Sequence, residues 1–229
     1  MSQPPQQDLY QEVPREDVRP SIPCSARSVL DVGCGPGGFG PTVRDVLGPA
    51  VRLVGIEAVL KQAALAREGH GYDEVVDGYY PEALSGREER FDLVCFNDVL
   101  EHVIDPWSML RDTIPLLTPN GKVLAAIPSI QFAPIVWRLI KGRWDYLDYG
   151  TLDRTHLRFF TRATMTEMFE QTGYRVLDCR GANGLEVTWA AEPRLGRRLA
   201  KRGLLPFLGD SRYIHFIVLA EPRPDEVSG

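Results

Sequence analysis

The sequence has no long apolar run and few cysteines. No stretch approaches the ~20 apolar residues needed to cross a bilayer, and residues 1–7 are polar, without the apolar centre of a signal peptide. The four cysteines are scattered and form no Cys-x-x-Cys pair, which excludes the commonest thiol-based metal and redox motifs. We therefore expect a cytoplasmic protein with reduced thiols and no transmembrane anchor.

Positive charge is scarce too. The formal net charge of the 229 residues is −5, which argues against non-specific nucleic-acid binding, because such binding needs a basic surface. Arginine outnumbers lysine 22 to 4, a bias that we attribute to genome composition. No nucleic-acid partner is expected. With 44% hydrophobic and 25% charged residues, the chain suits one globular domain with a full core.

Short apolar segments rich in β-branched residues alternate with helical ones from residue 26 onward. We expect strands at 28–32, 51–56, 74–77, 90–96, 121–127, 174–179 and 213–220. Helices are expected at 38–47, 58–68, 106–116 and 161–171. This alternation predicts an α/β fold with a mostly parallel sheet and helices on both faces.

Two segments interrupt the alternation, residues 129–160 and 181–210. Both leave the carboxyl side of the predicted sheet, where open α/β sheets bind ligands, so we expect them to form the substrate wall. We divide the chain into a tail and lead-in (1–25), a binding core (26–128), a lid or substrate insert (129–160) and a C-terminal part of the same domain (161–229).

A short apolar helix is expected at 132–141 in the first insert, and a basic amphipathic stretch at 195–207. Both are too short to span a membrane. Each can be a lid over the substrate or a contact with another chain, or it can lie on a membrane surface. The sequence leaves these alternatives open, together with a homodimer.

The most informative stretch is Val29-Leu-Asp-Val-Gly-Cys-Gly-Pro-Gly-Gly-Phe39, a buried strand that runs into a glycine-rich turn and then into a helix. Gly33, Gly35 and Gly37 let the backbone turn tightly and approach a ligand. The loop also satisfies the dinucleotide spacing G-x-G-x-x-G. However, Asp31 would repel a pyrophosphate bound there. The same carboxylate suits a cofactor with a cationic amino-acid end and no phosphate.

Asp31-Val-Gly-Cys-Gly-Pro-Gly resembles the first motif of class I methyltransferases that use S-adenosylmethionine, which carries an ammonium, a sulfonium and no phosphate. The resemblance covers residues 27–127, because Phe91-Asp-Leu-Val-Cys-Phe-Asn-Asp and residues 117–124 are similar to later motifs of this class. It implies a Rossmann-like seven-stranded sheet with an antiparallel last strand. It also implies S-adenosyl-L-methionine as cofactor and S-adenosyl-L-homocysteine as product.

The resemblance implies where this cofactor binds. Glu57, 24 residues after Gly33, can accept both ribose hydroxyls. Asp77 is similar in position to the residue that holds the adenine amino group, and Asn97 to one beside the methionine part. The candidate cofactor residues are, in chain order, Asp31, Gly33, Cys34, Gly35, Glu57, Ala58, Asp77, Gly78 and Asn97.

Methyl transfer to a hydroxyl needs a base that takes the hydroxyl proton, and histidine is the side chain best suited to that at neutral pH. The chain has four histidines. His70 lies in a predicted surface turn and His215 inside the last predicted strand, so neither is expected to act. His156 lies in a polar loop with aromatic residues, 150–161, which we expect over the cleft. It is the first candidate for a catalytic residue.

Together with Gly142-Arg-Trp-Asp-Tyr, the loop of His156 resembles methyltransferases found beside glycosyltransferases in polysaccharide and natural-product pathways. A structural role, in which His156 bonds Asp153 or Asp148, is the alternative. We expect an enzyme that methylates a small-molecule acceptor, foremost a hydroxyl of a sugar or secondary metabolite. N- or C-methylation, a non-catalytic partner subunit that binds S-adenosylmethionine and an NAD(P) enzyme are the alternative functions.

His102 is the second catalytic candidate. Asp98, Glu101 and His102 have i, i+3, i+4 spacing, so a helical turn would put them on one face. With His156 they could bind a divalent cation that lowers the pKa of the acceptor hydroxyl. This arrangement resembles ubiquinone-pathway O-methyltransferases and metal-dependent RNA 2′-O-methyltransferases. Glu-His-Val is also common at this position in metal-free relatives, so the cation stays an open alternative.

Overall fold

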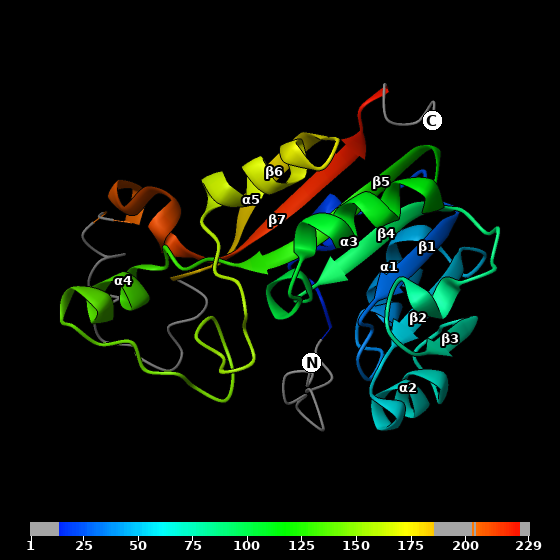
Figure 1. Cartoon of the computed structure of the whole chain (residues 1–229), viewed down its shortest axis with the longest axis horizontal. Coiled ribbons are helices and arrows are strands. Elements are labelled where there is room, and N and C mark those ends of the chain that lie inside the picture. Colours follow the sequence, from blue (N-terminus) through cyan, green and yellow to red (C-terminus); the bar gives the residue numbers. More distant parts are fainter. Residues whose placement is uncertain (1–13, 186–202, 204, 225–229) are drawn as a thin grey trace.

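The computed structural model describes residues 14–185, 203 and 205–224. Its centre is a seven-stranded sheet in the order β3-β2-β1-β4-β5-β7-β6 (Figure 1). β1 to β5 pair in parallel, and β7 pairs antiparallel with both β5 and β6. The predicted Rossmann-like sheet with an antiparallel last strand is confirmed. The strands are β1 (Ser28–Val32), β2 (Arg52–Glu57), β3 (Glu74–Asp77), β4 (Phe91–Asn97), β5 (Leu117–Pro128), β6 (Tyr174–Gly184) and β7 (Tyr213–Pro222).

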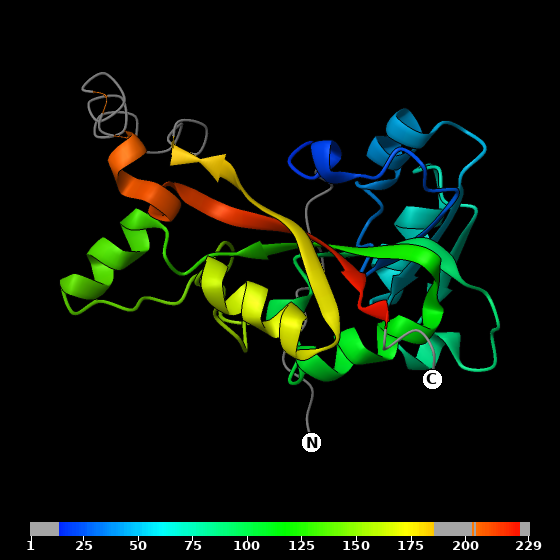
Figure 2. The same cartoon turned by 90° about the horizontal axis from the view of Figure 1, so that it is seen from above.

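Helices cover both faces of this sheet, as Figures 1 and 2 show. On one face, Leu110 and Phe169 pack in a core with Leu30 of β1. On the other face, Val43 packs with Val29 of the same strand. Successive side chains of a strand point to opposite faces, so β1 contributes to both cores. The helices are α1 (Gly40–Leu47), α2 (Leu60–Arg67), α3 (Pro106–Thr113), α4 (Ala133–Ile140) and α5 (Arg162–Gln171), with short 3₁₀ turns η1 (Arg19–Ser21), η2 (Glu82–Leu84), η3 (Leu100–His102), η4 (Ile114–Leu116) and η5 (Leu205–Arg212).

Local signals set several helix boundaries. α5 begins with a capping box, in which the side chains of Thr161 and Thr164 each accept a hydrogen bond from the other residue's backbone N–H. α1 begins at Gly40, two residues later than predicted. The reason is Gly37, whose φ of 98° is not helical, so that residues 37–39 still belong to the glycine-rich turn.

Three strands are longer than predicted, β7 only slightly, since it continues to Pro222 opposite Tyr174. β5 begins at Leu117, which already pairs with Phe91 across a register shift. β6 continues past Cys179 because β7 supplies partners along its whole length, as far as Gly184 opposite Tyr213. The second insert therefore begins after residue 184 rather than at 181. Most of it, including much of the basic stretch at 195–207, lies outside the described residues, as does most of the predicted tail.

The first insert carries its own small apolar cluster. Phe132, Ile135 and Leu152 pack with Leu185 and with Leu208 of η5. α4 and η5 consequently lie side by side at the end of the molecule farthest from β3 (Figures 1 and 2). Among the described residues, no helix is both long enough and apolar enough to cross a membrane.

The core at β4 can be tested by truncating Phe96. This side chain is fully buried and contacts the ring of Tyr80 edge-on, with 5.8 Å between centroids. Phe96→Ala should lower the free energy of unfolding by about 3–5 kcal/mol, because it leaves a cavity. Leu60→Ala, at a side chain that is 68% exposed, should change it by no more than about 0.5 kcal/mol. Urea denaturation measures both, and equal effects would contradict this account of the core.

Candidate active site

A cavity of about 1280 Å³ opens at the carboxyl ends of β1, β2 and β4. The strand order reverses here, since β2 and β4 flank β1, and open α/β sheets bind ligands at such a point. The lead-in, the first insert and β7 complete its wall. All but one of the predicted site residues line it, namely Asp31, Gly33, Cys34, Gly35, Glu57, Ala58, Gly78, Asn97, His102 and His156.

The glycine-rich loop is held by its backbone and by one carboxylate. Gly33 donates its N–H to the carbonyl of Ile56 at 2.8 Å. Its φ is 68°, and a Cβ there would lie 2.8 Å from Cγ2 of Val99, so only glycine fits. Gly35 donates its N–H to Oε2 of Glu57 at 2.8 Å. The loop is therefore already shaped as a cradle with no side chain in the way.

Glu57 connects this loop to the start of α2. Its second oxygen accepts the N–H of Val59 at 2.8 Å. Burial raises the pKa of Glu57, and the hydrogen bonds from the backbone of Val59 and Gly35 oppose that shift. The backbone of Ala58 contributes a third bond. A carboxylate offers about four acceptor positions, so acceptor capacity remains for a ligand hydroxyl on the cavity side.

Asp31 and Asn97 place buried acceptor oxygens between β1 and β4. Asp31 is 1% exposed and accepts hydrogen bonds from the Tyr72 hydroxyl at 2.6 Å and from the Asn97 amide at 3.4 Å. Burial raises the pKa of Asp31 to about 7, although both hydrogen bonds lower it. Oδ1 of Asn97 is buried without a hydrogen-bond partner. Because buried polar atoms are normally paired, this wall fits a ligand that donates N–H groups.

Asp77 and Gly78 were both predicted to bind the cofactor, but only one of them lines the cavity. Gly78 lines the cavity, with a φ of 135° and its N–H on the carbonyl of Glu57. The carboxylate of Asp77 lies 2.5 Å from the guanidinium of Arg67 and is 44% exposed. Asp77 is the one predicted site residue that does not line the cavity.

Glu101, His102 and His156 meet on the cavity wall. η3 carries the first two residues and the first insert carries His156. Candidate ligand atoms of all three lie within 4.8 Å of one another. The two imidazole rings are 4.6 Å apart and nearly perpendicular, and Nε2 of His156 is 3.9 Å from Oε1 of Glu101. The carbonyl of Glu101 also accepts the N–H groups of Leu157 and Arg158, which attaches the insert to η3.

Hydrogen bonds fix the tautomers of both histidines. Nδ1 of His156 lies 3.0 Å from the carbonyl of Thr151, which can only accept, so this nitrogen carries the proton. The hydroxyl of Thr155 donates to Asp153 at 2.7 Å and therefore accepts from Nδ1 of His102 at 3.1 Å. In the neutral ring of His156, Nε2 keeps its lone pair.

Burial disfavours positive charge on the two histidines of this cluster. It lowers the pKa of His102 to about 4, helped by His156, and it lowers the pKa of His156. Both imidazoles are therefore neutral at pH 7 and able to accept a proton. Burial, followed by the charge of Asp98, raises the pKa of Glu101 well above its usual value. Both carboxylate oxygens of Glu101 lack a hydrogen-bond partner.

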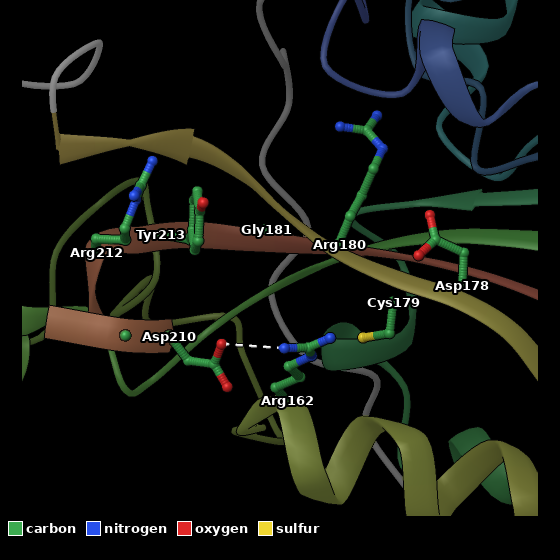
Figure 3. Close-up of a pocket in the computed structure, with 9 residues that line it drawn as sticks. Arg162, Asp178, Cys179, Arg180, Gly181, Asp210, Arg212 and Tyr213 are labelled. Atoms are coloured by element: carbon green, nitrogen blue, oxygen red, sulfur yellow. Dashed lines mark hydrogen bonds and ion pairs between the residues drawn. The ribbon is translucent and has the colours of Figure 1, made fainter. Parts of the chain in front are cut away.

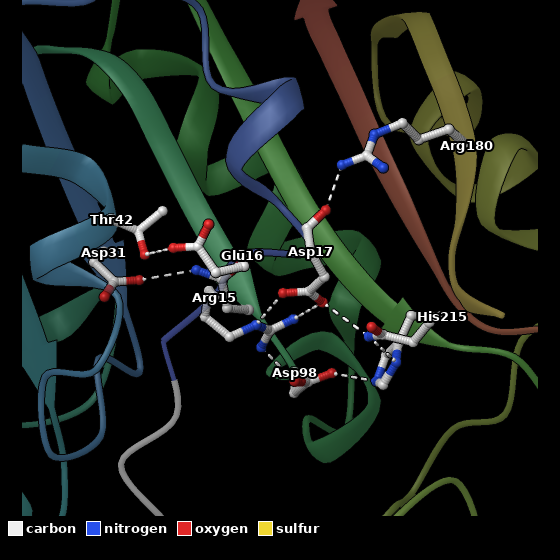
Figure 4. A network of polar contacts seen from close by, with 10 residues as sticks. Arg15, Glu16, Asp17, Asp31, Thr42, Asp98, Arg180 and His215 are labelled. Carbon is white, nitrogen blue, oxygen red and sulfur yellow. Dashed lines mark hydrogen bonds and ion pairs between the residues drawn. The ribbon is translucent and has the colours of Figure 1, made fainter. Parts of the chain in front are cut away.

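Asp98, expected in the same cluster, belongs to a separate ion-pair network (Figure 4). Its carboxylate lies 2.5 Å from Arg15 and 3.1 Å from Nε2 of His215. Asp17 accepts two further hydrogen bonds from Arg15, each of 2.9 Å. Although burial opposes it, the charges of Arg15 and His215 hold the pKa of Asp98 below its usual value.

Arg15 and His215 are two residues of this network that line the cavity and that the sequence did not reveal. The lead-in has no motif that marks Arg15. His215 was not expected to act as the base because it lies in the last predicted strand; the structure confirms that position in β7 and shows that the residue also lines the cavity. It pairs with Pro128, the last residue of β5. The start of an antiparallel strand lies at the carboxyl edge of its parallel neighbours, which was the usable signal.

A smaller hollow of about 380 Å³ lies between β6, η5 and α5 (Figure 3). Three arginines line it, but they have partners within the protein. Arg162 lies 3.2 Å from Asp210, and Arg180 donates to Oγ of Ser21 at 2.7 Å. Arg212 stacks on the ring of Tyr213. Nothing in this hollow indicates a ligand.

Known proteins that are similar to this chain include methyltransferases, in agreement with the chemistry of the larger cavity. A family model described as a methyltransferase domain matches residues 8–178. A ubiquinone biosynthesis O-methyltransferase of Coxiella burnetii is 27% identical over 170 residues, which cover 72% of this chain and 70% of the relative. The enzyme of the same name from Methylobacterium nodulans is 30% identical over 185 residues, with 76% and 71% covered.

Solved structures show the same fold. A SAM-dependent methyltransferase from Archaeoglobus fulgidus superposes with a TM-score of 0.60 at 16% identity, covering 89% of this chain and 90% of its own. The family match spans more than half of the sequence and includes every strand that lines the cofactor end of the cavity. The chain therefore belongs to the methyltransferase-domain family and is a class I S-adenosylmethionine-dependent methyltransferase.

Proposed function

We propose that this methyltransferase transfers its methyl group to a hydroxyl of a small molecule, a sugar or a secondary metabolite. The observation that carries this proposal is the neutral His156, whose free Nε2 faces the cavity wall beside Glu101. A hydroxyl needs such a base, whereas an amine acceptor does not. Relatives named O-methyltransferases support it.

The cofactor's methionine end is assigned to Asp31, Asn97 and Arg15. Its ammonium donates to the carboxylate of Asp31 and to the unpaired Oδ1 of Asn97. Arg15 is the one arginine or lysine among the described residues that line the cavity, and its charge acts on Asp31. It is the group best placed for the cofactor carboxylate.

The nucleoside end is assigned to the other side of the glycine loop. Glu57 takes the ribose hydroxyls with its remaining lone pairs, and Ala58 lies beside it. The turn of Asp77 and Gly78 receives the adenine, with Asp77 leaving Arg67 to accept the amino group. These assignments place the sulfonium toward β4, between the glycine loop and the histidine cluster.

In the proposed reaction the acceptor oxygen attacks the methyl carbon, the carbon–sulfur bond breaks and S-adenosylhomocysteine leaves. Nε2 of His156 takes the hydroxyl proton, and the carbonyl of Thr151 on Nδ1 stabilises the imidazolium that forms. His102, fixed through Thr155 and Asp153, orients the acceptor. The protein's main contribution is the alignment of the two reactants.

A divalent cation fits the same cluster. Glu101 offers two unpaired oxygens, and one ligand atom each of Glu101, His102 and His156 lies within 4.8 Å of the other two. Each histidine donates its other nitrogen's proton to an oxygen, the arrangement usual around histidine ligands of metals. Asp98 is not part of this set, because Arg15 and His215 hold it. A bound cation would lower the pKa of the acceptor hydroxyl.

The acceptor can be identified directly. The purified protein is incubated with methyl-labelled S-adenosylmethionine and a metabolite extract, and the labelled product is isolated. A methyl ether on a sugar or secondary metabolite is the expected result. A methylated amine or carbon would overturn the assignment to a hydroxyl, and a chain that binds the cofactor but labels nothing would support a non-catalytic subunit.

Cofactor affinity should depend on pH through Asp31. The carboxyl group takes up a proton as the pH falls through about 7, and the ammonium needs the charged form. The affinity for S-adenosylhomocysteine should therefore fall by up to about tenfold per pH unit below 7, as measured by titration calorimetry. Asp31→Asn should weaken binding by roughly 10- to 100-fold at pH 8 and flatten the profile.

Asp112→Asn, at an exposed side chain, is the matched control and should keep both the affinity and the pH profile. Gly33→Arg should abolish binding, because its side chain would fill the cradle against Val99. An affinity that does not change between acidic and neutral pH in the wild type would refute the role of Asp31.

His156→Ala should separate binding from chemistry. The variant should keep its affinity for S-adenosylhomocysteine and lose about 10²- to 10⁴-fold in the rate of methyl transfer, once the acceptor is in hand. Its residual rate should rise with pH as the hydroxyl ionises unaided. An unchanged rate would favour an amine or carbon acceptor.

The cation is tested by chelation. In this alternative, in which His156 binds the ion instead of taking the proton, EDTA abolishes methyl transfer and Mg²⁺ or Zn²⁺ restores it; with His156 as the free base, EDTA leaves the rate unchanged. As a readout that does not need the acceptor, Zn²⁺ should bind the chelated protein in calorimetry, and Glu101→Gln should remove that binding. Glu170→Gln, on the exposed side of α5, is the control. Indifference to EDTA together with no calorimetric signal would exclude the cation.

A further inference from the structure

The end of α4 and the residues after it form an unusual surface. Every residue from 137 to 143 is exposed. We call this segment the α4 tip. It holds three large apolar side chains, three cations, one glycine and no acid: Trp137, Leu139 and Ile140 are 58%, 52% and 70% exposed, beside Arg138, Lys141 and Arg143.

Apolar exposure is concentrated at this end of the molecule. Of the 12 large hydrophobic side chains exposed among the described residues, seven lie on the α4 tip, on the loop after it or on η5. Figures 1 and 2 show α4 and η5 together at the end of the long axis. Clustered apolar exposure marks an interaction surface. The seven are Trp137, Leu139, Ile140, Tyr146, Leu147, Tyr149 and Phe207.

The charge of the tip is opposite to that of the whole chain. The sequence carries −5, whereas the tip carries three cations. Arg143 is paired with Asp145 at 2.8 Å. Within the described part of the chain, neither Arg138 nor Lys141 has an ion pair with a carboxylate, and the Lys141 ammonium lies 4.9 Å from the ring centroid of Trp137. A tryptophan beside cations is the composition of a group that sits among lipid headgroups.

We propose that the α4 tip docks on the surface of an anionic lipid bilayer. Leu139 and Ile140 enter the boundary between headgroups and acyl chains, and Trp137 lies at the headgroup level. Arg138 and Lys141 bind the lipid phosphates, each contributing on the order of fivefold to the partition constant. α4 has only eight residues, so it lies on the bilayer and does not cross it.

Docking would bring the active-site cavity to the membrane. Tyr149 and Gly150, which follow the tip by a short loop, line that cavity. In combination with the proposed function, on which this step rests, the acceptor is an amphipathic molecule that is held in the bilayer and presents its hydroxyl at the surface.

Vesicle flotation of the full chain tests the docking itself and needs no acceptor. The protein should float with vesicles of equal parts phosphatidylcholine and phosphatidylglycerol, should not float with phosphatidylcholine alone, and should dissociate at high salt. Replacing both Trp137→Ser and Ile140→Ser should lower binding roughly tenfold or more. Replacing both Arg138→Glu and Lys141→Glu should lower it by a similar factor.

Matched controls change an exposed apolar residue and an exposed pair of cations elsewhere. Leu177→Ser, on β6, and the pair Lys61→Glu with Arg111→Glu are exposed and should float like the wild type. All variants should keep the melting temperature and the affinity for S-adenosylhomocysteine. Because that affinity is measured on the same samples, a wild type that floats but does not bind S-adenosylhomocysteine would count against the proposed function and not against docking.

Three results would overturn the proposal. The wild type fails to float with anionic vesicles, or the tip variants float as well as the controls. The third result is a dimer, detected by light scattering, that dissociates when Trp137 and Ile140 are both replaced by serine. A second copy of the chain would then occupy this surface.

Discussion

The parallel pairing of β1 with both β2 and β4 is the constraint on which the rest of the structure depends. It places Val32, Ile56 and Phe96 side by side in register, so that the three segments that follow leave the sheet at one edge. The connections then diverge to opposite sides of β1, because the strand order reverses there. A crevice remains between them, and Glu57 and Asn97 lie at its rim without any insertion needed to gather them.

The crevice holds more acceptors than donors. Asp31, Glu57 and Glu101 are each less than a tenth exposed, and a buried carboxylate is unfavourable unless it is paired. Burial accordingly raises the pKa of all three. Oxygens of Asn97 and Glu101 have no partner within the protein. Unpaired acceptors on one wall destabilise the protein in the absence of a ligand. They also form a binding surface for cationic and N–H-bearing groups.

Two segments outside the core complete the site by contacts to one loop, the residues between β4 and α3. The lead-in reaches it through the ion pair of Arg15 with Asp98. The first insert reaches it through the carbonyl of Glu101, which accepts the N–H groups of Leu157 and Arg158. The cofactor side and the acceptor side of the cavity thus share a support, and displacement of this loop would affect both. The same insert continues outward into the α4 tip.

The sequence by itself determined the sheet, the glycine-rich loop and the cofactor residues near it. These depend on short-range patterns: strand alternation, the conformational freedom of Gly33 and Gly35, and acids at the carboxyl ends of strands. Strand ends were less predictable, since β6 extends only as far as β7 can pair with it. Only the tertiary structure decided which distant groups share a site. In the structure His156 lies beside Glu101, Asp98 pairs with Arg15, and His215 lines the cavity. These contacts depend on distance in space, which spacing along the chain does not give.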